Sequence, residues 1–142
     1  MSPTQVTQEK ISAYLATSYS VQIGKEQLVL KIGEASPALV DLFAATRTSG
    51  AAYLTAFNPH GTMQSDSDNV QANAHLMNAI RQAGYSFFEG SSRADQGDWP
   101  AEVSYLILGL TLDDAKHLGT SYRQDALLWA GPDGVPELIV LR

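Results

Sequence analysis

Two segments of this chain are apolar along almost their whole length, and they constrain the fold more than any other feature. The first is AAYLTAF, residues 51–57, and the second is EVSYLILGL, residues 102–110. Neither shows the apolar-polar alternation of a strand with one wet face, so both are predicted to be strands covered on two sides. Such strands need a layer on each face, and the rest of the chain must supply it.

Four further segments have the end signals of helices that could cover these strands. Residues 4–17 carry a narrow apolar stripe at helical spacing, and residues 36–47 begin with Ser-Pro, which suits a helix start. Residues 65–83 begin with a serine cap and stop before a glycine. Residues 112–119 follow a threonine cap and have two aspartates in the first turn. These segments are predicted to be the covering helices.

The remaining apolar segments are predicted to be strands at the margins of the sheet. Residues 19–33 alternate around a Gly-Lys turn, and residues 125–141 contain two apolar runs joined by Gly-Pro-Asp-Gly, so each predicts a hairpin. Residues 85–90 are predicted to be a short strand and the polar residues 91–100 an exposed loop. The pattern predicts a single α+β domain over residues 1–142, with one mixed, partly antiparallel sheet of about six to seven strands covered by about three to four helices.

Charge and cysteine content exclude several classes of function. The chain of 142 residues has a formal net charge of -6 and only scattered Lys and Arg, so a nucleic-acid partner is not expected. The lack of cysteine removes disulfides, thiolate metal sites and thiol nucleophiles. The first ten residues do not resemble a secretory signal, and no apolar run reaches the roughly 18 residues of a membrane helix. We therefore expect a cytoplasmic protein without a membrane segment.

Motifs for cofactors and metals are not found in the sequence. No G-x-G-x-x-G opens a helix and no phosphate-binding loop lysine is present, so no nucleotide cofactor is expected. The sequence DSDN at 66–69 resembles the start of a calcium loop, but the required glycine and closing glutamate do not follow. The histidines lack the spacing of zinc ligands, and His75 and His117 are predicted on exposed helix faces. We expect neither a metal nor a cofactor.

Two asparagines lie on the apolar face of the helix predicted for residues 65–83. At about 100° per residue, Asn69 and Asn73 fall on the side that also carries Leu76 and Ile80. A buried amide without a partner costs roughly 1–3 kcal/mol, so both amides must be satisfied. Either they hold the preceding loop and a strand end together, or they line a polar pocket at the helix N-terminus. The sequence leaves both interpretations open.

Other polar side chains are predicted at strand ends near this helix. If they converge, they form an amide-rich site with one carboxylate, Glu102. That carboxylate is a candidate general base, and His60, in the loop after residue 57, is a second acid–base candidate. The predicted ligand-binding residues are Thr55, Asn58, Asn69, Asn73, Glu102, Ser104 and Gln124.

Three stretches of the sequence resemble a known family. LTAFNPHG, DWPAEVSYLILGL and YRQDALLW, together with the helix that bears the two asparagines, resemble the bacterial family called domain of unknown function 3293. The resemblance covers residues 19–129. It implies that the polar positions chosen above are those that the family pattern retains, and it implies no activity. The family patterns T-A-x-N-P, W-P-x-E-x-S and Q-x-A fall on Thr55, Asn58 and Pro59, on Trp99, Glu102 and Ser104, and on Gln124 and Ala126.

Three functions remain open at this level. The leading hypothesis is a domain that binds a polar small molecule, or a short polar peptide segment, in a pocket lined by Asn, Glu and Gln side chains. In the first alternative the asparagines are structural, and a protein partner binds an outer surface such as the acidic loop at residues 94–98 or an exposed hairpin edge. The second alternative is a small enzyme that uses Glu102 as general base. The sequence does not determine the oligomeric state.

Overall fold

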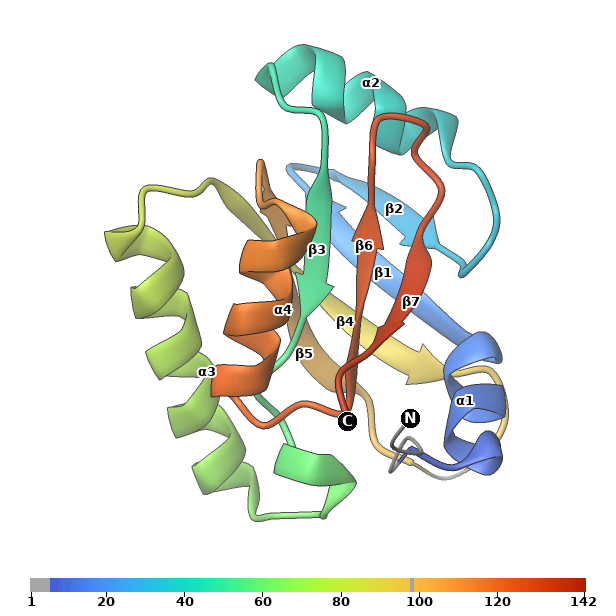
Figure 1. The fold of residues 1–142 in the computed structure, drawn as a ribbon, viewed down its shortest axis with the longest axis vertical. Coiled ribbons are helices and arrows are strands. Elements are labelled where there is room, and N and C mark those ends of the chain that lie inside the picture. The colour runs from blue at the N-terminus through green and yellow to red at the C-terminus, as the bar shows by residue number, and fades with distance from the viewer. Residues whose placement is uncertain (1–5, 98) are drawn as a thin grey trace.

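Seven strands form one sheet in the part of the chain that the structure, a computed structural model, describes: residues 6–97 and 99–142 (Figure 1). The strands are β1 (Thr17–Ile23), β2 (Glu26–Leu30), β3 (Ala51–Leu54), β4 (Phe87–Ala94), β5 (Glu102–Leu108), β6 (Ala126–Ala130) and β7 (Glu137–Val140). Their order across the sheet is β2-β1-β4-β5-β3-β6-β7, and every neighbouring pair is antiparallel. The two apolar segments, now β5 and β3, lie side by side at the centre of the sheet.

Four α-helices accompany the sheet within the described residues. They are α1 (Gln8–Leu15), α2 (Pro37–Thr46), α3 (Asp66–Gln82) and α4 (Leu112–Ser121), and a short 3-10 turn at Pro59–Gly61 precedes α3. The starts of the last three helices are set by the predicted caps, because each cap side chain accepts a hydrogen bond from the backbone N–H of the third residue of its helix. These caps are Ser36, Ser65 and Thr111.

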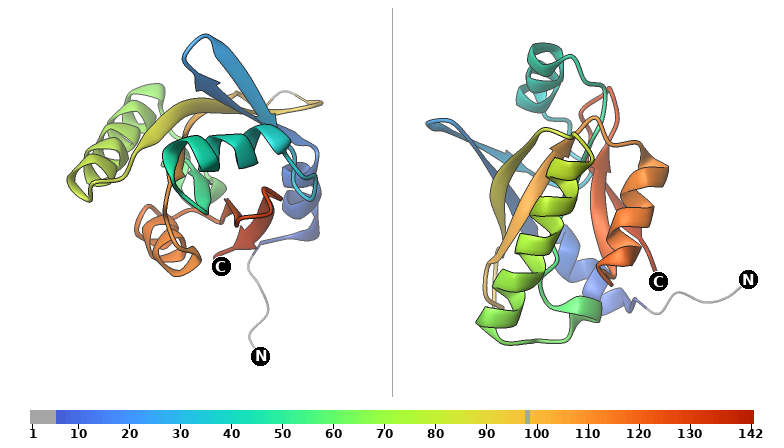
Figure 2. Two further views of the ribbon diagram at one scale, coloured as in Figure 1. Left: turned by 90° about the horizontal axis from the view of Figure 1, so that it is seen from above. Right: turned by 90° about the vertical axis from the view of Figure 1, so that its left-hand side faces the viewer.

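The sheet curls, so that it has a concave and a convex face (Figure 2). α2 lies across one end of the concave side, and α1 lies at the opposite end, beside β1. α3 and α4 pack against the convex face. Within the described residues, α2 covers one end of the concave face, and the candidate site lies at the other end, beside α1.

Alternating side chains of the central strands pack into two apolar clusters, one on each face of the sheet. On the concave side, Tyr53 and Leu106 pack with Phe43 of α2. On the convex side, Leu54 and Ile107 pack with the inner faces of α3 and α4. All four residues of β3 are buried, which explains why this strand is apolar throughout.

The prediction of an α+β fold is confirmed, with three differences in detail. The sheet is antiparallel throughout the described residues rather than mixed. The loop predicted for residues 91–100 is wrong in its first part, because β4 continues to Ala94, where it pairs with Thr17 of β1. The first helix is shorter than the predicted 4–17, since Thr17 already belongs to β1, and residues 4 and 5 lie outside the described residues.

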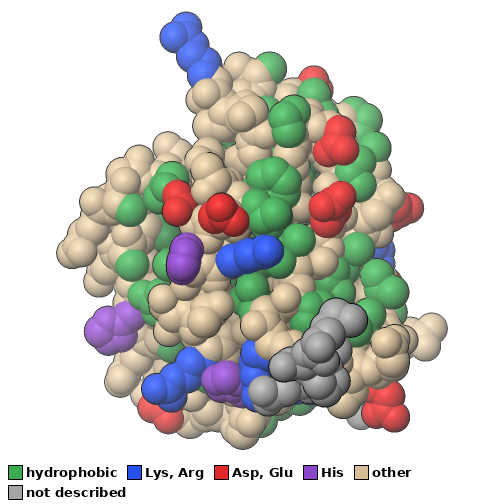
Figure 3. All heavy atoms as spheres, in the orientation of Figure 1, with side chains coloured by type: hydrophobic (Ala, Val, Ile, Leu, Met, Phe, Trp, Pro, Cys, Tyr) green, Lys and Arg blue, Asp and Glu red, His purple; other side chains and the backbone are tan. Residues whose placement is uncertain are grey.

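The surface gives no indication of a specialised environment. Among the helices of the described residues, none has both the length and the apolar character needed to cross a membrane. On the face shown in Figure 3, Lys and Arg side chains occupy small separate areas among Asp, Glu and His side chains.

Candidate functional site

A cavity of about 310 Å³ lies at the end of the concave face opposite α2. α1 forms one side of it, the strands form its floor, and the turn after β3 and the segment before β5 form its rim. Five of the predicted ligand-binding residues line it: Thr55, Asn58, Glu102, Ser104 and Gln124. The lining also contains five aromatic side chains, Tyr14, Tyr19, Tyr53, Phe57 and Trp99.

Glu102, the first residue of β5, supplies the carboxylate of the cavity. Its Oε2 accepts hydrogen bonds from Nδ2 of Asn58 at 2.8 Å and from Nε1 of Trp99 at 3.2 Å. Its Oε1 accepts no hydrogen bond from any described residue. Burial raises the pKa of Glu102 above its ordinary value, and the two hydrogen bonds oppose that shift without cancelling it. One oxygen of this carboxylate is thus held in place while the other is available to a ligand.

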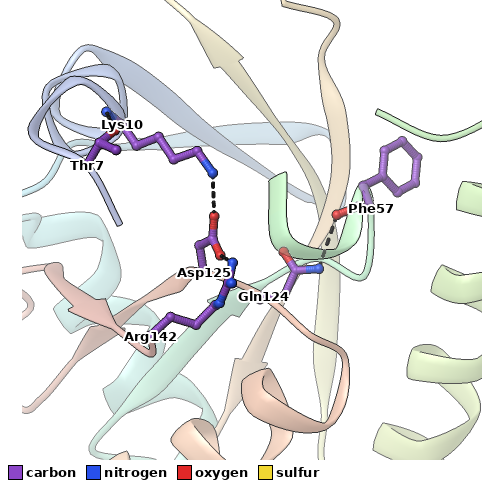
Figure 4. Close-up of polar contacts among 6 residues, drawn as sticks. All are labelled: Thr7, Lys10, Phe57, Gln124, Asp125 and Arg142. Carbon is purple, nitrogen blue, oxygen red and sulfur yellow. Dashed lines mark hydrogen bonds and ion pairs between the residues drawn. The ribbon is translucent and has the colours of Figure 1, made fainter. Parts of the chain in front are cut away.

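Gln124, just before β6, presents a second available acceptor. Its Nε2 donates to the backbone carbonyl of Phe57 at 3.1 Å, which fixes the side chain beside the turn (Figure 4). Its Oε1 accepts no hydrogen bond from the described residues. Within those residues, no fully buried side-chain nitrogen or oxygen lacks a partner. Oε1 of Gln124 and Oε1 of Glu102 therefore keep some solvent-accessible surface, and because both residues line the cavity we call these two atoms the cavity acceptors.

Asn58 connects the cavity to α3. Its backbone is left-handed, with φ of 47°, a conformation that asparagine tolerates better than most residues. Its Oδ1 accepts from the backbone N–H of Gln64 at 3.0 Å and from Nδ2 of Asn69 at 3.1 Å, while its Nδ2 donates to Glu102. The turn and the carboxylate are thereby fixed to the same amide.

Thr55 and Ser104 line the cavity, but their hydroxyl groups are already used. The Thr55 hydroxyl donates to the carbonyl of Val103 at 2.7 Å and accepts from the backbone N–H of Phe57 at 3.1 Å. The Ser104 hydroxyl donates to the carbonyl of Glu102 at 3.1 Å. Both side chains shape the strand ends around the carboxylate.

Three tyrosines give the cavity an aromatic wall. The hydroxyl of Tyr53 donates to the carbonyl of Ser20 at 2.9 Å, passing over Gly90 of β4, where a Cβ would lie 1.9 Å from that carbonyl oxygen. The hydroxyl of Tyr19 donates to the carbonyl of Tyr14 at 2.9 Å and so ties β1 to α1. Burial raises the pKa of all three tyrosines, that of Tyr14 to about 12, so their phenols are neutral at neutral pH.

Asp125, at the edge of the cavity, joins α1 and the C-terminal end to β6 (Figure 4). Its side chain is 2% exposed, and it accepts from Nζ of Lys10 at 2.8 Å and from a guanidinium nitrogen of Arg142 at 2.6 Å. Burial alone would raise the pKa of Asp125, but the hydrogen bonds and charges of the two basic side chains hold it below its ordinary value. Lys10, which lines the cavity, thus already has an ion-pair partner, although Asp125 shares its single negative charge between Lys10 and Arg142.

Asn69 and Asn73 point inward as predicted, but they do not line the cavity. Asn73 accepts from the backbone N–H of Ala56 at 2.8 Å and donates to the carbonyl of Val103 at 2.8 Å. Asn69 accepts from the backbone N–H of Asn58 at 2.9 Å and donates to its side chain. We call these two asparagines and their backbone partners the amide joint. Its contacts favour the structural interpretation of both residues.

Two other candidates do not line the cavity, although their chain neighbours do. His60 is exposed, and its backbone N–H donates to the carbonyl of Arg123 at 2.7 Å. Asp95, in the predicted acidic loop, pairs with Lys31 and accepts from the Ser18 hydroxyl at 2.7 Å. Asp98, in the same predicted loop, lies outside the described residues. No group of three or more His, Cys, Asp or Glu side chains in the described part of the chain is arranged to hold a metal ion.

The comparison with protein families connects this site to a known group. The family described as "Protein of unknown function (DUF3293)" matches residues 54–127. The chain belongs to the DUF3293 family. No curated protein and no solved structure shows significant similarity to it. The resemblance identified in the sequence is confirmed, and it carries no activity with it.

The DUF3293 match covers one part of the cavity and leaves out another. Thr55, Asn58, Glu102 and Gln124 fall inside residues 54–127, as does the whole amide joint. α1 and the three tyrosines fall outside this range. The polar half of the site is therefore the part that the family pattern describes.

Sequence reasoning missed the aromatic wall and the pairing of Lys10 with Asp125. A signal for the wall was present, since Thr17, Tyr19 and Val21 alternate onto one face of the first hairpin strand. Nothing local in the sequence relates Lys10 to Asp125, because 115 positions separate them.

Proposed function

We propose that this DUF3293 domain binds a small polar molecule in the cavity between α1 and the sheet. One observation carries the proposal: the two cavity acceptors, on Glu102 and Gln124, have no protein partner in the described residues, although the polar side chains around them do. Polar atoms that are fixed in place, accessible to solvent and without a protein partner are available to a ligand. Each acceptor is fixed by a hydrogen bond at the other atom of its own group.

The size and composition of the cavity support the same proposal. A volume of about 310 Å³ lies at the lower end of the range for small-molecule sites, roughly 300–1,000 Å³. Such sites combine mostly apolar and aromatic walls with a few placed polar groups. Here the walls come from tyrosines and Trp99, and the polar groups come from the strand ends.

A second candidate function is an enzyme in which Glu102 acts as general base. One observation favours it: burial raises the pKa of Glu102, and a raised carboxyl pKa suits proton transfer near neutral pH. A compound that binds the cavity tests this idea when it is incubated with wild type and with Glu102→Gln. A new product in the wild-type sample alone, detected by mass spectrometry, supports catalysis. Recovery of unchanged compound from both samples supports binding only.

The interaction alternative has less support. Asp95 already pairs with Lys31, so its charge is not free for a partner. The other acidic residue invoked in that hypothesis, Asp98, lies outside the described residues.

A thermal-shift screen against polar metabolites tests the binding proposal. A ligand at about 100 times its Kd adds about 2.7 kcal/mol to the stability of the folded state, so the melting temperature of wild type rises measurably. Glu102→Gln should lose this shift. Glu89→Gln removes the same charge from an exposed position of β4 and should keep it. A screen without any shift, or a shift of equal size in Glu102→Gln, contradicts the proposal.

A further inference from the structure

The cavity contains one charge that no neighbouring residue compensates. Lys10 and Arg142 share the single negative charge of Asp125, so the three charges sum to about +1 but each cation already has an ion-pair partner. Glu102 forms no ion pair with any described residue. Its two hydrogen-bond donors, a carboxamide and an indole, are neutral. Glu102 therefore presents to any ligand a carboxylate that has no ion-pair partner among the described residues.

Aromatic side chains line the same cavity as this carboxylate. The indole of Trp99 donates to Glu102 directly, at 3.2 Å. The charge of Glu102 contributes to the raised pKa of Tyr14, Tyr19 and Tyr53, although burial is the larger cause, so all three rings lie within range of its field. Aromatic faces carry partial negative charge and attract cations, most strongly where water is excluded. The walls and the carboxylate thus favour the same sign of ligand.

Ligands of other charge fit this arrangement less well. An anion would meet the field of Glu102, and Lys10, the basic residue in the cavity lining, is already paired with Asp125. A neutral ligand would displace water from Glu102 without supplying a counter-charge, and an unpaired buried charge is costly. A cation supplies the counter-charge and replaces the lost water in one contact.

We infer that the ligand of this cavity carries a cationic nitrogen, an ammonium or guanidinium group, that binds Oε1 of Glu102 between the aromatic side chains. The inference rests on the proposed function and adds the chemical class of the ligand. Oε1 of Gln124 is the second acceptor and can receive a further N–H or O–H of the same molecule. A cavity of about 150 Å³ holds one benzene, so a volume of about 310 Å³ has room for an aryl or alkyl group beside the cation.

Three probes of one shape and different charge test this inference: benzylammonium, benzyl alcohol and benzoate. Each is titrated into ¹⁵N-labelled protein, and the amide signals of the cavity residues report binding. We expect benzylammonium to bind wild type at least about tenfold more tightly than benzyl alcohol, because only the cation pairs with the carboxylate. The preference should disappear in Glu102→Gln and persist in Glu89→Gln, which loses a charge outside the cavity.

The outcomes separate this inference from the proposed function. Benzyl alcohol or benzoate binding in the cavity as tightly as benzylammonium overturns the cationic ligand and leaves small-molecule binding intact. Absence of any shift in the cavity signals with all three probes overturns both. Persistence of the preference in Glu102→Gln overturns the role of Glu102. The comparison of the three probes on wild type needs no variant, so it decides the matter even if Glu102→Gln does not fold.

Discussion

The amide joint and the cavity share the same strand ends, but they differ in how their polar atoms are used. In the joint, Asn73 saturates a backbone N–H of the turn and a carbonyl of β5, and no amide atom of Asn69 or Asn73 is left without a partner. In the cavity, Glu102 and Gln124 each use one atom to hold the side chain and leave one acceptor open. The same kinds of residue therefore have all their polar atoms paired in the joint and keep one acceptor without a protein partner in the cavity, where we propose that a ligand binds.

This difference separates stability from function residue by residue. Removing a saturated buried amide leaves backbone groups without partners, so its cost appears as lost stability. Altering a group that faces a ligand removes binding with little loss of stability, and it sometimes raises stability. Each of the following variants tests on which side of that division a residue lies.

The largest effect is expected for Asn73→Ala. The change leaves the buried backbone N–H of Ala56 without an acceptor and removes the hydrogen bond to the carbonyl of Val103. We therefore expect the free energy of unfolding to fall by about 2–4 kcal/mol. Chemical denaturation measures it. Asn78→Ala, at an exposed position of the same helix, is the control and should stay within about 0.5 kcal/mol of wild type. Equal effects for the two variants would show that the joint is not structural.

A smaller effect is expected for Asp125→Asn. The two basic partners are partly exposed and can return to water, so we expect a loss of about 1–2 kcal/mol at neutral pH. The pKa of Asp125 is depressed in the folded state, so this stabilisation is present above the ordinary carboxyl pKa and is lost as pH falls through the folded value. Denaturation curves at several pH values should show the difference from wild type closing in acid. A constant difference, or an equal loss in the exposed control Asp41→Asn, contradicts the ion-pair account.

The smallest effect on stability is expected for Glu102→Gln. Unlike the two variants above, it should raise the free energy of unfolding at neutral pH. The pKa of Glu102 is raised in the folded state, so its contribution to stability is fully present below the ordinary glutamate pKa and is lost as pH rises through the folded value. Glutamine keeps an acceptor for Asn58 and does not ionise. The variant should therefore gain stability relative to wild type as pH rises toward neutrality. A loss of stability that grows with pH would place Glu102 with the structural residues.

The parts of the fold that depend on local chemistry could be predicted from the sequence. Ser36, Ser65 and Thr111 were recognisable as caps because a capping side chain acts on its own first turn. The extension of β4 to Ala94 was missed because it depends on pairing with β1, more than 70 positions away. Polar residues in a pairing strand look like a loop until the partner strand is known.

The candidate site likewise has parts that the sequence predicts and parts that it does not. Helical periodicity correctly turned Asn69 and Asn73 toward the interior, because that direction is a local property of the helix. Helical periodicity does not show which face of the sheet a helix covers. α3 covers the convex face, and the cavity lies on the opposite face. The aromatic wall needed the curl of the sheet and the position of α1, and both are set by long-range packing.

The central claim is that the joint carries stability and the cavity carries binding. The most direct test is to measure the dissociation constant of benzylammonium for wild type, Asn73→Ala and Glu102→Gln by NMR titration, at a temperature where all three are folded, beside their free energies of unfolding. The account predicts that Asn73→Ala is destabilised but binds within about twofold of wild type, while Glu102→Gln keeps its stability and binds at least about tenfold more weakly. Weaker binding by Asn73→Ala with unchanged stability, or unfolding of Glu102→Gln with unchanged binding, would contradict it.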